Sequence, residues 1–169
     1  MEILYSSTRS AGAPVSASQA ILKGLSDDGG LFVPNQIAKL TKSLKELAEM
    51  SYQEVAYEVM KLYLTDFTEE ELKTCIARAY DSKFDTEVIA PLVEAEGAYY
   101  LELFHGSTIA FKDMALQILP HLLKKSVEEN REFHVVFFTH SLSTKERIER
   151  VFRCNWEFFD ICLEKSDES

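Results

Sequence analysis

Two hydroxyl residues, each followed three positions later by a glutamate, constrain the fold of this 169-residue chain most strongly. Ser51 with Glu54 has the spacing of a capping box, in which side chains and backbone N–H groups bond reciprocally at a helix start. Thr68 with Glu71 repeats that spacing. An apolar stripe of helical period follows each box: Tyr52, Val55, Ala56, Val59, Met60 and Tyr63 after the first, and Leu72, Cys75, Ile76, Ala79 and Tyr80 after the second. The first part of the chain is therefore predicted to be mainly helical.

Shorter elements are predicted before the first box. They are a strand at 3–6, a helix at 16–23, a turn at 27–30, a strand at 31–33 ended by Pro34, and a helical stripe at Leu40, Leu44 and Leu47. Gly24 is placed to cap the helix at 16–23, because glycine adopts positive φ at no steric cost. The two glycines of the turn, which reads Asp-Asp-Gly-Gly, have the same freedom.

The second part of the sequence predicts the beginning of an α/β layer arrangement with an incomplete sheet. The expected elements are a strand at 98–104, a polar turn at 105–108, a helix at 110–127 kinked by Pro120, a strand at 133–138 and a helix at 144–152. The side chains expected to face inward from the long helix are Phe111, Ala115, Ile118, Leu119, Leu122 and Leu123. Asp113, in its first turn, reads as an ordinary acidic residue near a helix start.

Composition excludes several classes of function. The formal charge of −10 disfavours general nucleic-acid and membrane-surface binding, because phosphate backbones and anionic lipids would be repelled. No apolar run approaches the length of a membrane span, and the first residues lack the pattern of a signal peptide. Three cysteines without close pairing argue against a zinc site or a disulfide framework, so no metal and a cytoplasmic location are predicted.

Lys112 is the candidate nucleophile. Its predicted place just inside a helix start, framed by Ala110, Phe111 and Met114, favours a neutral amine, because the helix dipole and an apolar wall both disfavour the ammonium. A neutral lysine attacks aldehydes, as Schiff-base lysines do. On position alone, however, most such lysines extend their charge to solvent.

Three segments resemble those of the threonine synthase family. Residues 105–113 read His-Gly-Ser-Thr-Ile-Ala-Phe-Lys-Asp and are similar to the family pattern His-Gly-Pro-Thr-x-Ala-Phe-Lys-Asp, whose lysine holds pyridoxal phosphate. Residues 5–9, Tyr-Ser-Ser-Thr-Arg, look like the family's amino-terminal motif. Residues 28–34, Asp-Gly-Gly-Leu-Phe-Val-Pro, look like its Asp-Gly-Gly-Leu-Phe-x-Pro turn. The three matches keep the family's order and cover about residues 1–130.

The resemblance implies a fold-type-II pyridoxal-phosphate enzyme that converts O-phospho-L-homoserine and water to L-threonine and phosphate. Lys112 would bind the cofactor and act as general base. The implied organisation is a helical amino-terminal domain at 1–95, the start of the cofactor domain at 96–130, and a divergent tail at 131–169.

Five further residues are candidates for substrate contact. His105 and Thr108 lie on the turn before the predicted helix, where turn formation and capping are equally plausible roles. Ser7, Thr8 and Arg9 would approach the substrate phosphate, although a structural role in the first strand is at least as plausible. Phe111 is interpreted as a core residue rather than a ring-stacking partner.

The sequence departs from the family pattern in two places. Ser107 replaces a proline that would stiffen the turn. After about Asn130 the resemblance ends, and no glycine follows Gly106 to form a close amide cradle for the cofactor phosphate. We therefore expect a truncated chain of impaired activity, with a tail that is read out of frame or belongs to a short divergent protein.

Two other functions stay open. The first is a non-catalytic helical module that binds a partner. The second is a related pyridoxal-phosphate enzyme that releases phosphate without forming threonine. The sequence leaves the oligomeric state undetermined.

Overall fold

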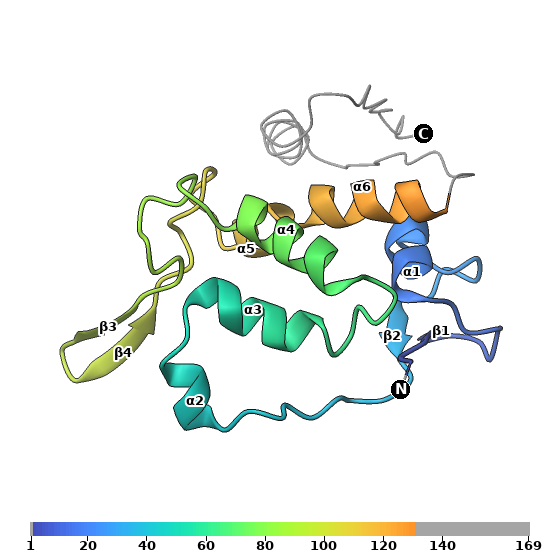
Figure 1. Ribbon diagram of the computed structural model, residues 1–169, viewed down its shortest axis with the longest axis horizontal. Coiled ribbons are helices and arrows are strands. Elements are labelled where there is room, and N and C mark those ends of the chain that lie inside the picture. The colour runs from blue at the N-terminus through green and yellow to red at the C-terminus, as the bar shows by residue number, and fades with distance from the viewer. Residues whose placement is uncertain (1, 131–169) are drawn as a thin grey trace, which may run out of the picture.

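The computed structural model describes residues 2–130, and Figure 1 shows helices between two small antiparallel sheets. The helices are α1 (Ala17–Lys23), α2 (Leu44–Ala48), α3 (Tyr52–Met60), α4 (Glu69–Ala79), α5 (Asp113–Leu116) and α6 (Leu119–Glu129). The strands are β1 (Tyr5–Ser7), β2 (Phe32–Pro34), β3 (Leu92–Ala95) and β4 (Ala98–Leu101). This is the predicted fold class, a mixed helix and strand fold with incomplete sheets. Within residues 2–130, no helix is long and apolar enough to span a membrane.

Helix α4 forms the centre of the core. Thr68 caps it with the complete capping box to Glu71. Every member of the predicted stripe is buried: Leu72, Cys75, Ile76, Ala79 and Tyr80. Phe67, Phe84, Ile89, Ile118 and Leu122 pack against this stripe in one cluster. Burial also raises the pKa of the Cys75 thiol to about 11, so this cysteine is a packing residue rather than a nucleophile.

Helix α1 has the predicted glycine cap at its end and packs along α6. Ser16 forms a capping box with Gln19, and Gly24 ends the helix with a φ of 67°. At the far end of α6, the side-chain amide of Asn130 donates to Ser18 Oγ at 3.1 Å. The first and last parts of the described chain are thereby held together (Figure 1).

The expected single helix at 110–127 is wrong. The chain forms the four-residue α5, breaks, and begins α6 at Leu119 with Pro120 in its first turn. Proline lacks a backbone N–H, and this absence has no cost at a helix start, so the break places Pro120 where it is tolerated. The break also turns Phe111 and Ala115 outward, whereas Ile118, Leu122 and Leu123 are buried as expected.

Two other predicted stripes are only partly correct. Helix α3 begins with the predicted Ser51–Glu54 box but ends before Tyr63. Its fully buried residue is Glu58, which pairs with Lys61 at 2.8 Å, while Val59 is exposed. The stripe at Leu40, Leu44 and Leu47 yields only the five-residue α2, which buries no residue.

Each small sheet is an antiparallel pair. Strand β1 pairs with β2, with Ser6 opposite Val33, and the turn at 27–30 lies between them as predicted. Strand β4 pairs with β3, a strand that the sequence analysis missed. The connecting turn has positive φ at Glu96 and Gly97, the geometry of a tight hairpin. The hairpin lies at the opposite end of the molecule from β1 and β2 (Figure 1).

Candidate functional site

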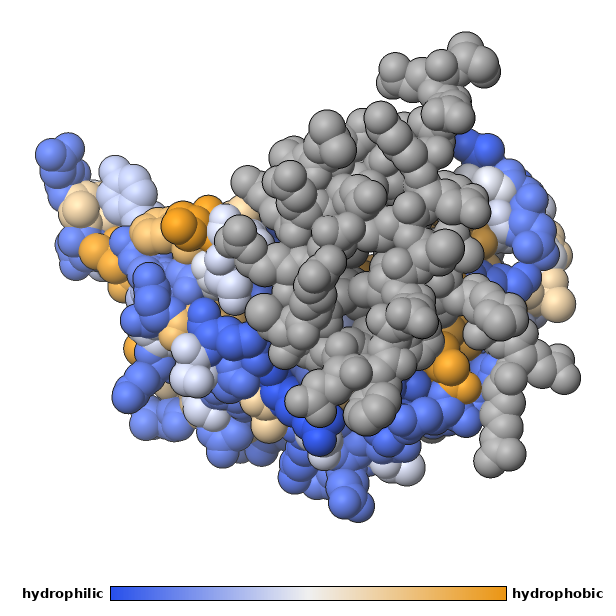
Figure 2. Space-filling view, turned by 90° about the horizontal axis from the view of Figure 1, so that it is seen from above, coloured by the Kyte–Doolittle hydropathy of each residue, from blue (hydrophilic) through white to orange (hydrophobic). Residues whose placement is uncertain are grey.

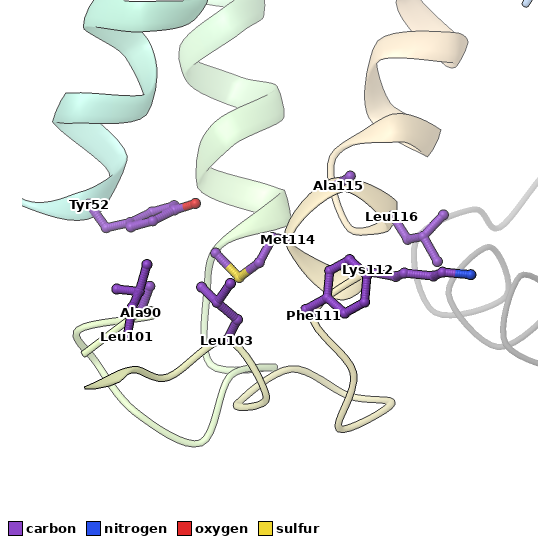
Figure 3. A pocket seen from close by; sticks show the side chains of 9 residues that line it. All are labelled: Tyr52, Ala90, Leu101, Leu103, Phe111, Lys112, Met114, Ala115 and Leu116. Atoms are coloured by element: carbon purple, nitrogen blue, oxygen red, sulfur yellow. The ribbon is translucent and has the colours of Figure 1, made fainter. Parts of the chain in front are cut away.

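A mostly apolar groove of about 680 Å³ lies between α3, the β4 end of the hairpin and α5. Its lining residues are Tyr52, Ala90, Leu101, Leu103, Phe111, Lys112, Met114, Ala115 and Leu116 (Figure 3). Lys112 is the one charged residue in this set. The volume is within the usual range of pockets for small ligands, about 300–1,000 Å³. The groove therefore offers one amine beside an apolar surface.

Lys112 lies at the edge of the groove rather than inside a helix. It is the residue before α5, its side chain makes no capping bond, and its aliphatic stem runs past Leu116 and away from Tyr52 (Figure 3). The predicted apolar frame is present in Phe111 and Met114, but the predicted helix dipole is not. A helix of four residues aligns too few peptide dipoles to act strongly on the amine.

Asp113, the residue after Lys112, closes the loop that leads to it. The Thr108 backbone N–H donates to Asp113 Oδ2, and the Thr108 hydroxyl donates to Asp113 Oδ1, both at 2.7 Å. The Asp113 side chain is completely buried, contrary to its interpretation as an ordinary first-turn acid. Gly106 makes this burial possible, because a Cβ there would lie only 2.5 Å from Asp113 Cβ. We call the Thr108–Asp113 pair of bonds the loop clamp.

The clamped loop has an unfavourable backbone conformation at Ile109. This β-branched residue has a φ of 56°, in the left-handed region that such side chains rarely adopt. Conformations of this kind cost on the order of 1–3 kcal/mol and persist only where the surroundings enforce them. Ile109 is 78% exposed and Phe111 is 67% exposed, so packing of these side chains does not enforce it. The prediction that Phe111 belongs to the core is wrong, because the break before α6 turns it outward.

His105 is held by two carboxylates rather than turned toward the groove. Its Nε2 lies 2.8 Å from Glu102 Oε2, and its Nδ1 contacts Asp85 Oδ1. These hydrogen bonds, first that to Glu102 and then that to Asp85, raise the pKa of His105. The Asp85 backbone N–H also donates to the His105 carbonyl at 3.0 Å. His105 thus joins the loop after α4 to the segment after β4, which is a structural role.

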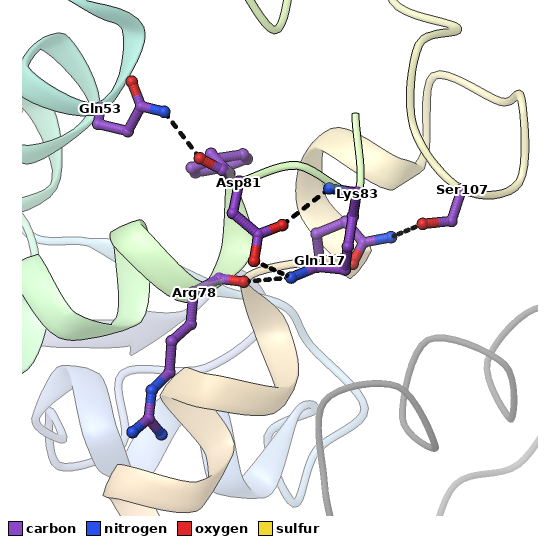
Figure 4. Close-up of polar contacts among 7 residues, drawn as sticks. Gln53, Arg78, Asp81, Lys83, Ser107 and Gln117 are labelled. Carbon is purple, nitrogen blue, oxygen red and sulfur yellow. Dashed lines mark hydrogen bonds and ion pairs between the residues drawn. The ribbon is translucent and has the colours of Figure 1, made fainter. Parts of the chain in front are cut away.

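Two neighbouring contacts fix the flanks of the clamped loop. The Tyr80 hydroxyl donates to the Met114 carbonyl at 2.7 Å, tying α5 to the end of α4. The Gln117 amide donates to Ser107 Oγ at 3.3 Å, from a side chain that is itself buried (Figure 4). Ser107, the departure from the family's proline, therefore restrains the turn through its hydroxyl.

The end of α4 is also crosslinked, as Figure 4 shows. Gln53 of α3 donates to the Tyr80 carbonyl at 2.7 Å, and Lys83 pairs with Asp81 at the same distance. Tyr80 in turn packs edge-on against Tyr52, with ring centroids 4.9 Å apart. Through Tyr52, the groove wall is connected to the helical core.

The structure does not bring Ser7, Thr8 and Arg9 to the groove. Ser7 donates its hydroxyl to the Asp28 carboxylate at 2.8 Å, and the Arg9 guanidinium donates to the Asp28 carbonyl at 3.3 Å. Thr8 Oγ1 accepts from the Leu31 backbone N–H at 3.1 Å. Hydrogen bonds, first from Ser10 and then from the Gly30 backbone and Ser7, hold the pKa of Asp28 well below its usual range. These residues brace the turn between β1 and β2.

Sequence reasoning missed most of the groove. Tyr52 lies sixty positions before Lys112 and was interpreted only as part of a helical stripe, so no local signal indicates its place beside the lysine. The sequence analysis also did not identify Asp85 and Glu102 as hydrogen-bond partners of His105. Within residues 2–130, no group of three or more His, Cys, Asp and Glu side chains is suited to hold a metal ion.

The chain is similar to known proteins in both sequence and structure. Residues 4–80 match a family model described as "Threonine synthase N terminus". A threonine synthase from Schizosaccharomyces pombe is 41% identical over 127 residues, which cover 73% of this chain and 24% of that protein. The chain thus spans about a quarter of the length of this curated relative.

Two solved structures agree with the sequence matches. The crystal structure of threonine synthase from yeast superposes with a TM-score of 0.69 at 35% identity, covering 75% of this chain and 27% of that one. The structure of PLP-bound threonine synthase from Brucella melitensis gives a TM-score of 0.75 at 29% identity, covering 89% of this chain and 33% of that one.

Proposed function

The amino-terminal part of this chain belongs to the threonine synthase family, and from this premise we propose that it carries the cofactor-binding lysine of a pyridoxal-phosphate enzyme. The observation that carries the proposal is Lys112. It is the one charged residue that lines the apolar groove, and it stands on the segment that resembles the family's lysine motif.

The groove suits the ring and aldehyde of pyridoxal phosphate. Its apolar lining extends from Tyr52 past Met114 to Phe111 and suits a flat aromatic ring (Figure 3). When bound, the cofactor supplies an electron sink for carbanion chemistry at the substrate. None of the residues lining the groove is assigned to its phosphate, because Lys112 is needed at the aldehyde.

Lys112 has two roles in this proposal. Its Nζ binds the aldehyde in the resting enzyme, and it then accepts and returns protons as a general base. Both roles require the side chain to rotate from its path beside Leu116 toward Tyr52, which its exposed position permits. The backbone beneath it is fixed by the clamped loop, so the rotation is confined to the lysine side chain.

The proposed reaction converts O-phospho-L-homoserine and water to L-threonine and phosphate. We also propose the cytosol as its location, in agreement with the free, buried Cys75 thiol. Incubating the chain with this substrate and the cofactor, then measuring threonine and phosphate separately, tests the reaction. Phosphate without threonine would indicate the phosphate-releasing enzyme instead. Absence of both products would contradict catalysis by these 169 residues.

Cofactor binding has its own test, borohydride trapping on the full chain. In its deprotonated form, the Lys112 amine would condense with the aldehyde carbon to form a C=N bond, and the aldehyde oxygen would leave as water. Borohydride then delivers hydride to that carbon, and solvent protonates the nitrogen, leaving a stable adduct for peptide mass spectrometry. We expect the adduct at Lys112 to exceed that at Lys45, an exposed lysine of α2.

Matched variants complete this test. Lys112→Ala should remove the dominant adduct, whereas Lys45→Ala should leave it unchanged. Equal labelling of Lys112 and Lys45 in the wild-type chain would overturn the proposal, because it would mean that the groove confers no preference for Lys112.

A second candidate, a partner-binding module, is favoured by one observation. The β3–β4 hairpin is exposed along both strands and carries Leu92, Val93, Tyr99, Tyr100 and Leu101. Figure 2 shows apolar side chains at this end of the molecule. If the hairpin binds a second copy of this chain, the chain should self-associate, and Tyr100→Lys should abolish this. Molar mass from analytical ultracentrifugation measures the association. A monomeric wild-type chain would exclude self-association.

A further inference from the structure

We propose that Thr108 and Asp113 are positioning residues for Lys112, acting through the loop clamp. This inference rests on the proposed function of Lys112, because it concerns how that amine is presented to an aldehyde. Neither residue lines the groove, so neither touches the cofactor in this proposal. They act on the backbone from which the lysine extends.

The clamp encloses Lys112 in a closed loop. Thr108 and Asp113 are joined by two hydrogen bonds of 2.7 Å, and Lys112 is the residue immediately before the second of them. Backbone bonds lie inside the same loop, from Ile109 N–H to the Gly106 carbonyl at 3.0 Å and from Asp113 N–H to the Ala110 carbonyl at 2.9 Å. The φ and ψ of Lys112 are therefore fixed at −61° and −22°. The direction of its Cα–Cβ bond is fixed with them.

The clamp restrains this loop through polar contacts rather than through apolar packing. The loop's large side chains, Ile109 and Phe111, are exposed, so burial of apolar surface does not hold it. Ile109 has positive φ, a conformation that needs external enforcement. Asp113 supplies that enforcement from a fully buried position, and Gly106 provides the space for its carboxylate.

Only the stem of Lys112 is left to move. The Lys112 side chain is exposed and makes no capping bond. A fixed base with a mobile amine reduces the conformational search needed for the lysine to reach an aldehyde in the groove. Proximity effects of this kind are sensitive to small displacements of the reacting group.

A purely structural role for the clamp makes a different prediction. If Asp113 and Thr108 serve only stability, breaking the clamp lowers the unfolding midpoint and leaves the labelling preference of the folded chain unchanged. If they position Lys112, the preference falls in chains that remain folded. The ratio of Lys112 adduct to Lys45 adduct separates these roles, because both lysines are measured in the same molecule.

The experiment compares the wild-type chain with Thr108→Val and Thr108→Ser, each treated with pyridoxal phosphate and borohydride well below its unfolding midpoint. Thr108→Val keeps the shape and the backbone donor but loses the hydroxyl bond to Asp113. We expect the Lys112 to Lys45 ratio to fall roughly tenfold. Thr108→Ser keeps the hydroxyl and should stay within about twofold of the wild-type ratio. Where Thr108→Val does not fold, Asp113→Asn takes its place, with a fall in the same direction.

The outcomes are distinct. A wild-type ratio in favour of Lys112 that Thr108→Val or Asp113→Asn leaves unchanged would overturn the positioning role while the proposed function stands. An equal ratio in Thr108→Val and Thr108→Ser, both reduced, would also overturn it, since the hydroxyl bond would then not be the cause. A wild-type chain without preference for Lys112 would contradict the proposed function itself, and this inference with it.

Discussion

The helical core and the lysine-bearing region are held together by different forces. Around α4, apolar side chains such as Leu72 and Ile76 are almost completely removed from water. Between Thr86 and Lys112, by contrast, both strands of the hairpin are exposed. In the loop that follows the hairpin, the side chains of Ile109 and Phe111 are also exposed. The core is stabilised by burial, and the loop is held by hydrogen bonds of a few polar groups.

This difference separates what gives the molecule its stability from what gives the lysine its geometry. Burial is non-directional, so the core keeps its shape under many apolar substitutions of similar volume. The loop clamp depends on a specific donor and acceptor, Thr108 and Asp113, and on one glycine. Substitutions in the two regions should therefore have different consequences, and the predictions below test this.

The largest effect is expected from truncation in the core. Ile76→Ala should lower the free energy of unfolding by about 2–5 kcal/mol, because it removes buried methyl groups and leaves a cavity. Phe111→Ala, in the exposed loop, should change it by less than about 1 kcal/mol despite the larger side chain removed. Urea denaturation of both variants measures this. Equal losses would mean that Phe111 is packed in solution, and the comparison would fail.

Removing the clamp should have the next largest effect. Asp113→Ala leaves the Thr108 donors without their acceptor and should cost about 1–3 kcal/mol of unfolding free energy. Hydrogen exchange should accelerate at 106–112 more than within α4. Asp27→Ala, which removes a carboxylate that is 90% exposed and pairs with Lys23, is the matched control and should cost under about 1 kcal/mol. Uniform acceleration across the chain would show that the clamp belongs to the core.

The cost of removing a helix cap should also be larger in the buried core than in an exposed helix. Thr68→Ala at the start of the buried α4 should cost about 1 kcal/mol, because the N-terminal backbone donors lose an acceptor. Ser43→Ala removes the same kind of box from α2, which buries nothing and can fray without loss of packing. Its cost in thermal unfolding should be smaller. A larger cost for Ser43→Ala would indicate that α2 is packed against something in solution.

The smallest effect is a pH dependence at His105. Its pKa is raised in the folded chain by the Glu102 and Asp85 carboxylates. A raised pKa means that the stabilisation is fully present below the unfolded value of about 6.5 and is lost as the pH rises through the folded value. The stability difference between the wild-type chain and His105→Gln should therefore shrink with rising pH. Titration of the imidazole by NMR with a midpoint at or below 6.5 would contradict this.

Local signals predicted the core well and the site only in part. The capping boxes at Ser51 and Thr68 are complete, because such boxes are formed by residues three positions apart. The α4 stripe is buried as its spacing predicts. In α3 the same reasoning failed at Val59, which is exposed while Glu58 is buried, since which face is covered depends on what packs there.

The lysine region escaped prediction for a related reason. A proline in an apolar helical pattern was interpreted as a kink, yet Pro120 marks the start of a second helix. That break turns Phe111 outward, whereas the burial of Asp113 depends on the space left by Gly106. Strand β3 was missed because its turn is Glu96-Gly97 rather than the Asn-Gly or Asp-Gly pair that marks a hairpin most strongly. The proposed role of Lys112 comes from the motif, while several of its neighbours in the groove, such as Tyr52 and Ala90, come from remote parts of the chain.

The β3–β4 hairpin also bears on how the protein behaves in concentrated solution. Each of its strands has an outer edge that no described strand pairs, and such edges are templates for intermolecular strand addition. At neutral pH the charge of −10 keeps molecules apart. Near the isoelectric point of about 4.9 that repulsion vanishes while the edges remain. Mildly acidic buffers are therefore the conditions under which this molecule is most prone to aggregate.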